Sequence, residues 1–172
     1  LPERRLDEPM DERLEWDRDG QYFHYLTKWM HALDQVARST GQAIFNEWAR
    51  ELAHAAHRAF AYAPPHGGCK RMYWKLSIDL SRPLVASMGQ HDPLDGLITC
   101  RQLEATATES GPRLADAIED FTAMVEPSGL ATGDPLGLGG LLTDAYRVAQ
   151  LGQDNAGTEG LVEALLAAAR VG

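Results

Sequence analysis

The chain has 172 residues, of which 44% are hydrophobic, enough for one substantial core and one domain. Its net charge of −9 disfavours nucleic acid as a partner, because phosphate binding requires clustered Lys and Arg side chains. There is no apolar run as long as a membrane span and no evident signal peptide, so we expect no membrane partner and a cytoplasmic location.

The first third of the chain predicts a helix pair. Residues 1–19 are strongly charged and predict a rim loop or a short helix. Apolar side chains then recur at i, i+3 and i+4 spacing, which predicts helices over about 21–38 and 42–62, with a break at 39–41.

The segment from residue 72 to residue 80 has a different period. Apolar and polar side chains alternate there, as in a half-buried strand. The polar face of this predicted strand would carry Lys75, Ser77 and Asp79, and Trp74 would point inward.

Asp-Pro-Leu occurs at residues 92–94 and again at 134–136, each time at the start of an apolar, helix-like run. Internal similarity of this kind is typical of a repeated unit, here a helical hairpin. The sequence therefore predicts a single all-α domain of repeated antiparallel hairpins with one strand-bearing insertion. The hairpins would cover about 21–62, 93–125 and 136–171, and the insertion about 63–92.

The links between the predicted pairs, 63–92 and 126–134, are long, whereas the links within each pair are short. Antiparallel helices place all the long links on one rim, where the first helix of each pair also begins. Binding and catalytic residues commonly lie on long loops, and helix N-termini favour polar or anionic ligands. We therefore expect a pocket at this rim.

The repeated hairpins, the aromatic-rich segment 21–29 and the insertion residues Met72 to Lys75 with Asp79 resemble the (α/α) toroid of six-hairpin glycosidases and sugar 2-epimerases. The resemblance is architectural and covers about residues 21–171. It implies a carbohydrate-active protein that acts on a small-molecule sugar or an oligosaccharide. A complete ring needs twice the hairpins predicted here, so the resemblance implies half a toroid, completed by a missing second half or by a homo-oligomer.

Candidate catalytic residues on this rim are His91 and Asp92, together with Asp79 and Lys75 of the predicted strand. His titrates near neutral pH and a carboxylate can orient it, so His91 and Asp92 could form an acid/base pair. The alternative for Asp92 is a helix N-cap, with Asp95 in a position like that of a capping box. The alternative for Lys75 and Asp79 is an ordinary solvated strand face.

Candidate substrate-binding residues are aromatic side chains that could stack on sugar rings and polar side chains near the same rim. They are Tyr22, His24, Lys28, His66, Tyr73 and Trp74. His24 and Lys28 share one face of the opening helix, which in a bundle without a cavity would be its exposed face.

The sequence contains no P-loop and no dinucleotide fingerprint, so no cofactor is expected. Adjacent His91 and Asp92 suggest a metal-dependent hydrolase, but Pro93 places the pair at a helix boundary, so no metal site is expected. Hydrolysis would need a pair of carboxyl groups, whereas epimerisation could use histidines, and both stay open. The alternative to an enzyme is a non-catalytic helical repeat module that binds a partner protein on its concave face.

Overall fold

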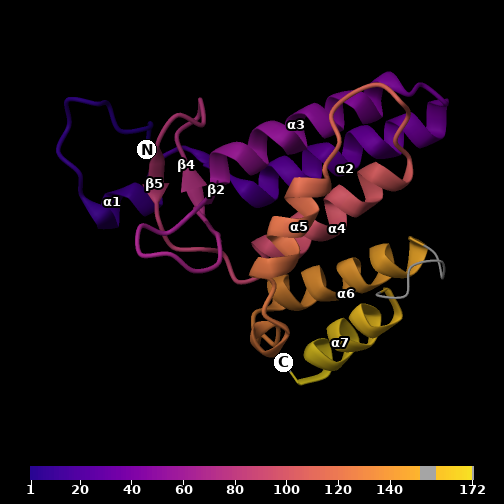
Figure 1. Ribbon diagram of the computed structural model, residues 1–172. Helices are drawn as coiled ribbons and strands as arrows, with labels where there is room; N and C mark the ends of the chain where they lie inside the picture. Colours follow the sequence, from indigo (N-terminus) through magenta and orange to yellow (C-terminus); the bar gives the residue numbers. More distant parts are fainter. Residues whose placement is uncertain (152–157, 172) are drawn as a thin grey trace.

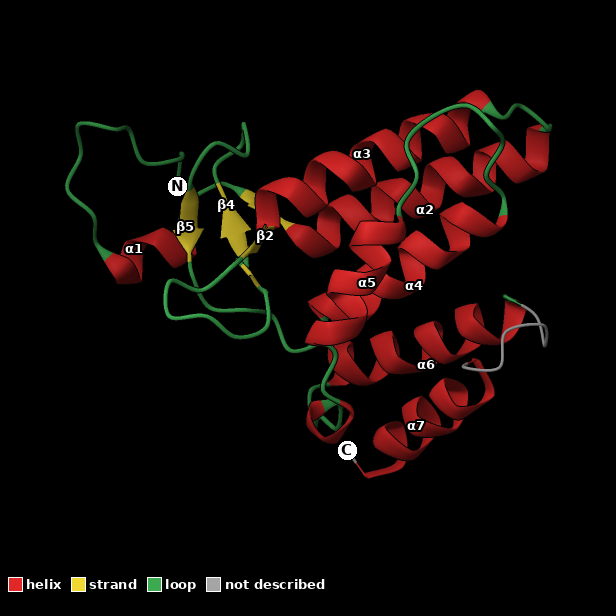
Figure 2. Cartoon of the chain, viewed as in Figure 1, coloured by secondary structure: helices red, strands yellow, loops and turns green. Residues whose placement is uncertain are grey.

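The computed structural model describes residues 1–151 and 158–171, and most of these residues are helical (Figures 1 and 2). The helices are α1 (Glu12–Asp17), α2 (Phe23–Thr40), α3 (Ile44–Phe60), α4 (Asp92–Ala105), α5 (Ala115–Met124), α6 (Pro135–Gln150) and α7 (Thr158–Val171), with a 3₁₀ turn, η1 (Pro127–Gly129). The short strands are β1 (Gln21–Tyr22), β2 (Ala61–Tyr62), β3 (Arg71–Met72), β4 (Lys75–Leu76) and β5 (Pro83–Val85). The predominantly helical character predicted from the sequence is confirmed.

The long helices pack in pairs, α2 with α3, α4 with α5 and α6 with α7 (Figure 1). The first helices of these pairs also contact one another, because α4 packs against both α2 and α6. The predicted link between α6 and α7, residues 152–157, lies outside the described residues. The closed ring of a toroid stays a prediction.

Two apolar clusters stabilise this arrangement. The first joins α2, α3, α4 and α5, with Phe23 and Phe121 at 5.6 Å between ring centroids. The second joins α4, α6 and α7 around Ile98 and Leu165. Because α4 contributes to both clusters, all its residues from Asp92 to Cys100 are buried. Polar side chains at the start of α4 are therefore held away from water.

The prediction of a strand over residues 72–80 is wrong, both in the length of the strand and in which side chains are buried. β4 is a two-residue strand between β1 and β5, and both Lys75 and Leu76 are buried, whereas Ile78 is 56% exposed. The Lys75 ammonium group donates hydrogen bonds to the backbone oxygens of Glu15 and Arg18. Contacts with the N-terminal segment therefore override the local alternation of side chains.

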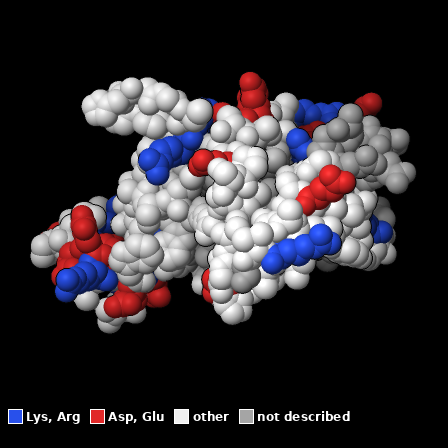
Figure 3. All heavy atoms as spheres, turned by 90° about the horizontal axis from the view of Figure 1, so that it is seen from below, with Lys and Arg blue, Asp and Glu red and all other residues white. Residues whose placement is uncertain are grey.

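The N-terminal segment carries many of the charges and is held by ion pairs. Buried Glu15 pairs with Arg4 at 2.5 Å, and Arg18 pairs with Glu8 at 2.9 Å. Figure 3 shows one face of the molecule, on which acidic and basic side chains gather densely at one end and are scattered singly or in small groups elsewhere. None of the described helices has the length and the apolar composition that a membrane span requires.

Asp134 caps α6, as its position before proline predicts. Its Oδ2 accepts a hydrogen bond from the Gly137 N–H at 2.7 Å. Asp134→Ala should therefore lower the free energy of unfolding by about 1 kcal/mol, the usual loss for an N-cap side chain. Urea unfolding measures this change, and Asp134→Asn, which keeps a capping oxygen, should stay near the wild type. Equal unfolding midpoints for Asp134→Ala and the wild type would contradict this role.

Candidate functional site

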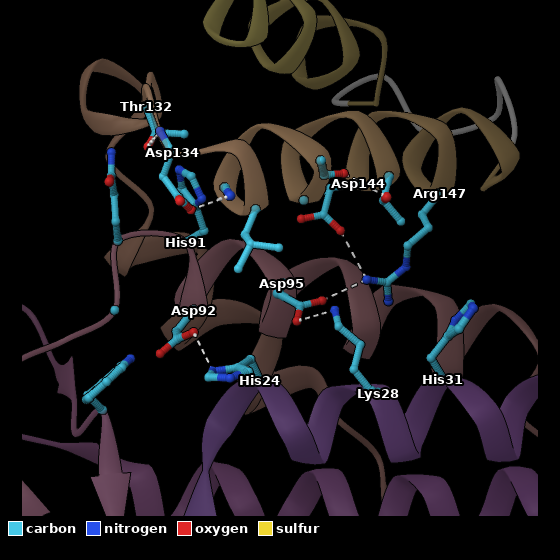
Figure 4. A pocket seen from close by; sticks show the side chains of 18 residues that line it. His24, Lys28, His31, His91, Asp92, Asp95, Thr132, Asp134, Asp144 and Arg147 are labelled. Carbon is cyan, nitrogen blue, oxygen red and sulfur yellow. Dashed lines mark hydrogen bonds and ion pairs between the residues drawn. The ribbon is translucent and has the colours of Figure 1, made fainter. Parts of the chain in front are cut away.

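A pocket of about 740 Å³ lies where α2, α4 and α6 meet, near the starts of α4 and α6 (Figure 4). The long links also contribute, through Trp74, Gly89 and Thr132. The structure thus places a cavity at the rim where the sequence predicts one. The polar side chains that line it include His24 and Lys28 from α2, Asp92 and Asp95 from α4, and Asp144 and Arg147 from α6.

Asp92 presents a buried carboxyl group to this pocket. Its Oδ1 lies 4.0 Å from the His24 Nδ1, and its Oδ2 is buried with no hydrogen-bond partner among the described residues. Burial, and then the negative charge of Asp95, raise the pKa of Asp92 to about 7, although Lys28 acts in the opposite direction. Near neutral pH this carboxyl therefore holds a proton that it can donate.

The interpretation of Asp92 as a helix N-cap is wrong. His91 occupies the N-cap position of α4, and no side chain caps this helix end. Asp95 does not complete a capping box either, because its carboxylate points across to α2 and α6 (Figure 4). The charges on these neighbouring helices attract it more strongly than the backbone N–H groups at the start of α4 do.

Asp95 is the centre of a buried charge network that joins three helices. Its Oδ1 accepts a hydrogen bond from Arg147 Nη1 at 2.7 Å. Its Oδ2 accepts one from Thr27 Oγ1 at 2.5 Å and one from Lys28 Nζ at 3.1 Å. Burial alone would raise the pKa of Asp95, but Lys28, Arg147 and these hydrogen bonds together hold the pKa below its ordinary value. Asp95 is therefore ionised, and its negative charge acts on the neighbouring carboxyl groups.

Asp144 is the third carboxyl group of the pocket. Its Oδ1 accepts a hydrogen bond from Arg147 Nη1 at 3.1 Å. Burial, and then the charge of Asp95, raise the pKa of Asp144 to about 6. Figure 4 shows Asp92 and Asp144 on different sides of Asp95. Between about pH 6 and pH 7 the pocket therefore combines a mainly protonated carboxyl group, Asp92, with a mainly ionised one, Asp144.

Three histidines line the pocket: His24, His31 and His91. Burial is the main cause that lowers the pKa of both His24 and His31, so their rings are neutral at neutral pH. The His91 Nε2–H donates to the backbone oxygen of Leu130 at 2.8 Å, which ties α4 to the loop before α6. His24 and His31 can therefore exchange protons or hydrogen-bond hydroxyl groups, whereas His91 holds the wall of the pocket in place.

The structure brings together half of the residues that the sequence predicts for the site. His24, Lys28, Trp74, His91 and Asp92 all line the pocket. The remaining candidates are Tyr22, His66, Tyr73, Lys75 and Asp79, and none of them lines it.

Each of these remaining candidates has a different environment. Tyr22 packs edge-on against Trp74 at 4.8 Å, Tyr73 stacks on Tyr62 at 4.2 Å, and His66 lies in an exposed loop. The polar face expected to unite Lys75 with Asp79 is not formed.

Lys75 is buried against the N-terminal segment, whereas Asp79 is exposed in a turn. Hydrogen bonds from Ser77, and then from Ser81, lower the pKa of Asp79 to about 2. Asp79 is therefore an ionised turn residue away from the pocket.

Asp95, Asp144 and Arg147 are site residues that the sequence analysis missed. Asp144 and Arg147 are three residues apart, so both lie on one face of α6. The spacing of this acid and this base, on a helix that begins at the repeated Asp-Pro-Leu, is the sequence feature that could have identified them as site residues. No group of three or more His, Cys, Asp or Glu side chains with the geometry of a metal site is found among the described residues.

Comparison of this chain with protein-family models, with curated proteins and with solved structures gave no match. The functional argument therefore depends on the geometry of the pocket.

Proposed function

We propose that this protein is a carbohydrate-active enzyme, a sugar hydrolase in which Asp92 is the general acid and Asp144 the general base. The observation that carries the proposal is the buried carboxyl of Asp92, whose Oδ2 has no hydrogen-bond partner among the described residues and whose pKa is raised to about 7 inside a polar pocket. Glycoside hydrolysis commonly uses two carboxyl groups, one protonated and one ionised. Asp92 and Asp144 provide these two states near neutral pH.

The neighbouring side chains fit supporting roles in this chemistry. Asp92 would protonate the oxygen of the bond to be cleaved, and Asp144 would take a proton from the attacking water. Arg147, which contacts both Asp95 and Asp144, would hold the carboxylates in position. Trp74 would offer an apolar face to the sugar ring.

Two other functions can be compared with the sugar hydrolase: a sugar epimerase and a non-catalytic module that binds a protein. The neutral imidazoles of His24 and His31 could accept a proton, which favours a sugar epimerase as the second candidate. A non-catalytic module that binds a protein would gain nothing from Asp92, because a buried carboxyl oxygen without a hydrogen-bond partner, here Oδ2, lowers stability. Perturbed carboxyl groups in a pocket are more typical of catalytic sites.

The proposal is tested with the full chain and a panel of free sugars, sugar acids and short oligosaccharides. Thermal shift identifies the sugars that bind, and NMR of the products separates cleavage of a glycosidic bond from inversion at a carbon. Binding followed by cleavage supports the hydrolase. Inversion without cleavage would support the epimerase instead, and no binding or turnover with any sugar would refute both.

Turnover should depend on pH in a way that follows from the two carboxyl groups. A general acid must be protonated, so kcat/KM should fall as the pH rises through about 7, where Asp92 loses its proton. A general base must be ionised, so kcat/KM should also fall as the pH drops through about 6, where Asp144 is protonated. The pH profile of kcat/KM for the best substrate measures both limbs. Activity that rises through pH 7 would show that Asp92 acts as a base.

A further inference from the structure

Aromatic rings form a continuous strip from the N-terminal segment to the edge of the pocket. The ring centroids of Trp16 and Trp74 are 4.5 Å apart, those of Trp74 and Tyr22 are 4.8 Å apart, and those of Tyr22 and Tyr25 are 5.2 Å apart. Trp29 follows Tyr25 by one turn of α2. These five residues are called the aromatic strip below.

The strip presents large apolar surfaces to solvent. Trp16 is 50% exposed, Tyr25 is 53% exposed and Trp29 is 67% exposed. None of these three side chains belongs to either of the two apolar clusters. Core packing therefore does not account for them, and exposed aromatic side chains gathered in one region are typical of a binding surface.

Two hollows of about 490 Å³ each lie along this strip. One is lined by Tyr25, Lys28 and Trp29, among others, and the second by Trp16, Tyr22 and Tyr25. Tyr25 is common to both hollows, and Lys28 also lines the pocket of Asp92. The strip is therefore continuous with the proposed catalytic pocket.

The polar residues between the rings identify the kind of ligand. The hollow around Trp16 is also lined by Asp17, Asp19 and Gln21, and Lys28 borders the hollow around Trp29. Charged residues are depleted from the cores of protein interfaces. Aromatic faces with polar groups at their edges instead match sugar rings, which combine apolar C–H faces with hydroxyl groups at the rim.

We infer that the aromatic strip is a second sugar-binding region and that the substrate is an oligosaccharide. One sugar unit would occupy the pocket of Asp92, while further units would stack along Tyr25 and Trp29 and along Trp16. This inference rests on the proposed hydrolase function, because it places the bond to be cleaved beside Asp92.

Oligosaccharides of increasing length test the inference with the full chain. The probes are β-1,4-glucan, xylan, mannan and α-1,4-glucan fragments from the disaccharide upward. In the wild type, affinity measured by calorimetry and kcat/KM should both rise with length. Trp29→Ala and Trp16→Ala should each lower the values for long fragments by about 3- to 10-fold, the size of one lost aromatic contact, and should have their smallest effect on the disaccharide, which reaches the fewest rings of the strip.

Trp48→Ala is the matched control. Trp48 is 48% exposed on α3 and lines neither hollow, so its loss should have no effect at any fragment length. If Trp16→Ala and Trp29→Ala behaved like Trp48→Ala while the wild type cleaved sugars, the strip inference would be overturned and the hydrolase proposal retained. Length-dependent binding that requires Trp16 and Trp29, without any turnover, would support the strip and refute the hydrolase.

Discussion

Asp92→Asn is expected to lower kcat by about 10²- to 10⁴-fold, the range that general acid catalysis contributes. An amide has nearly the shape of the carboxyl group but cannot give a proton to the departing sugar oxygen. Substrate affinity should change little, because His24, Lys28 and Trp74 remain in the pocket. Steady-state kinetics on the best cleaved sugar measure kcat and KM separately.

The same substitution should stabilise the protein at alkaline pH. The pKa of Asp92 is about 7 in the fold against an ordinary value of 3.8. Between about pH 4 and pH 7 the unfolded chain has lost a proton that the fold retains, so the free energy of unfolding falls as the pH rises through this range. Above pH 7 the cost is on the order of 4 kcal/mol. Asp92→Asn removes this cost, so its melting temperature should exceed the wild type at pH 8 and match it below pH 4.

Asp116→Asn is the control for both measurements of Asp92→Asn. Asp116 also lies in the first turn of a helix, α5, but it is exposed and away from the pocket. It should change neither turnover nor the pH dependence of stability. Unaltered kcat in Asp92→Asn would refute the role of Asp92 as the acid.

Arg147→Ala should lower the free energy of unfolding by about 3–5 kcal/mol, the cost of breaking a buried ion pair from one side. The guanidinium group is buried and donates to Asp95, Asp144, Gln102 and Thr99. Its removal leaves two carboxyl groups buried without this cation. Chemical unfolding in urea measures the loss.

Arg113→Ala provides the comparison for Arg147→Ala. Its side chain is 64% exposed and pairs with Glu104 at 3.2 Å on the surface. Exposed ion pairs contribute at most about 1 kcal/mol, so this variant should remain close to the wild type. Similar losses in Arg113→Ala and Arg147→Ala would show that the buried network does not hold α4 and α6 together.

The helices could be predicted from the sequence because their signals are local. Apolar side chains at helical spacing, Gly41 in the left-handed conformation after α2 and Asp134 before α6 each act within a few residues. The region of β4 could not be predicted, because Lys75 is buried by a contact with Glu15, far away in the sequence.

Some residues of the candidate site could likewise be predicted from local signals, whereas others depend on contacts between distant parts of the chain. The rim and the residues at helix starts, including His24 and Asp92, follow from the lengths of the links and from the order of the helices. The network of Asp95 and Arg147 links residues 52 positions apart, and it depends on how α4 meets α6. The raised pKa of Asp92 also depends on burial, which no local pattern shows.

The position of α4 between α2 and α6 makes the acidity of the pocket a property of the assembled protein. The Asp95 carboxylate accepts hydrogen bonds from Lys28 and Thr27 of α2 and from Arg147 of α6. Without α6 and α7, Asp95 would keep Thr27 and Lys28 but lose Arg147, and Asp144 would be absent from the pocket. The two carboxyl groups of the proposed acid/base pair would therefore come together only when the last helix pair docks, which couples the completion of folding to the appearance of a reactive site.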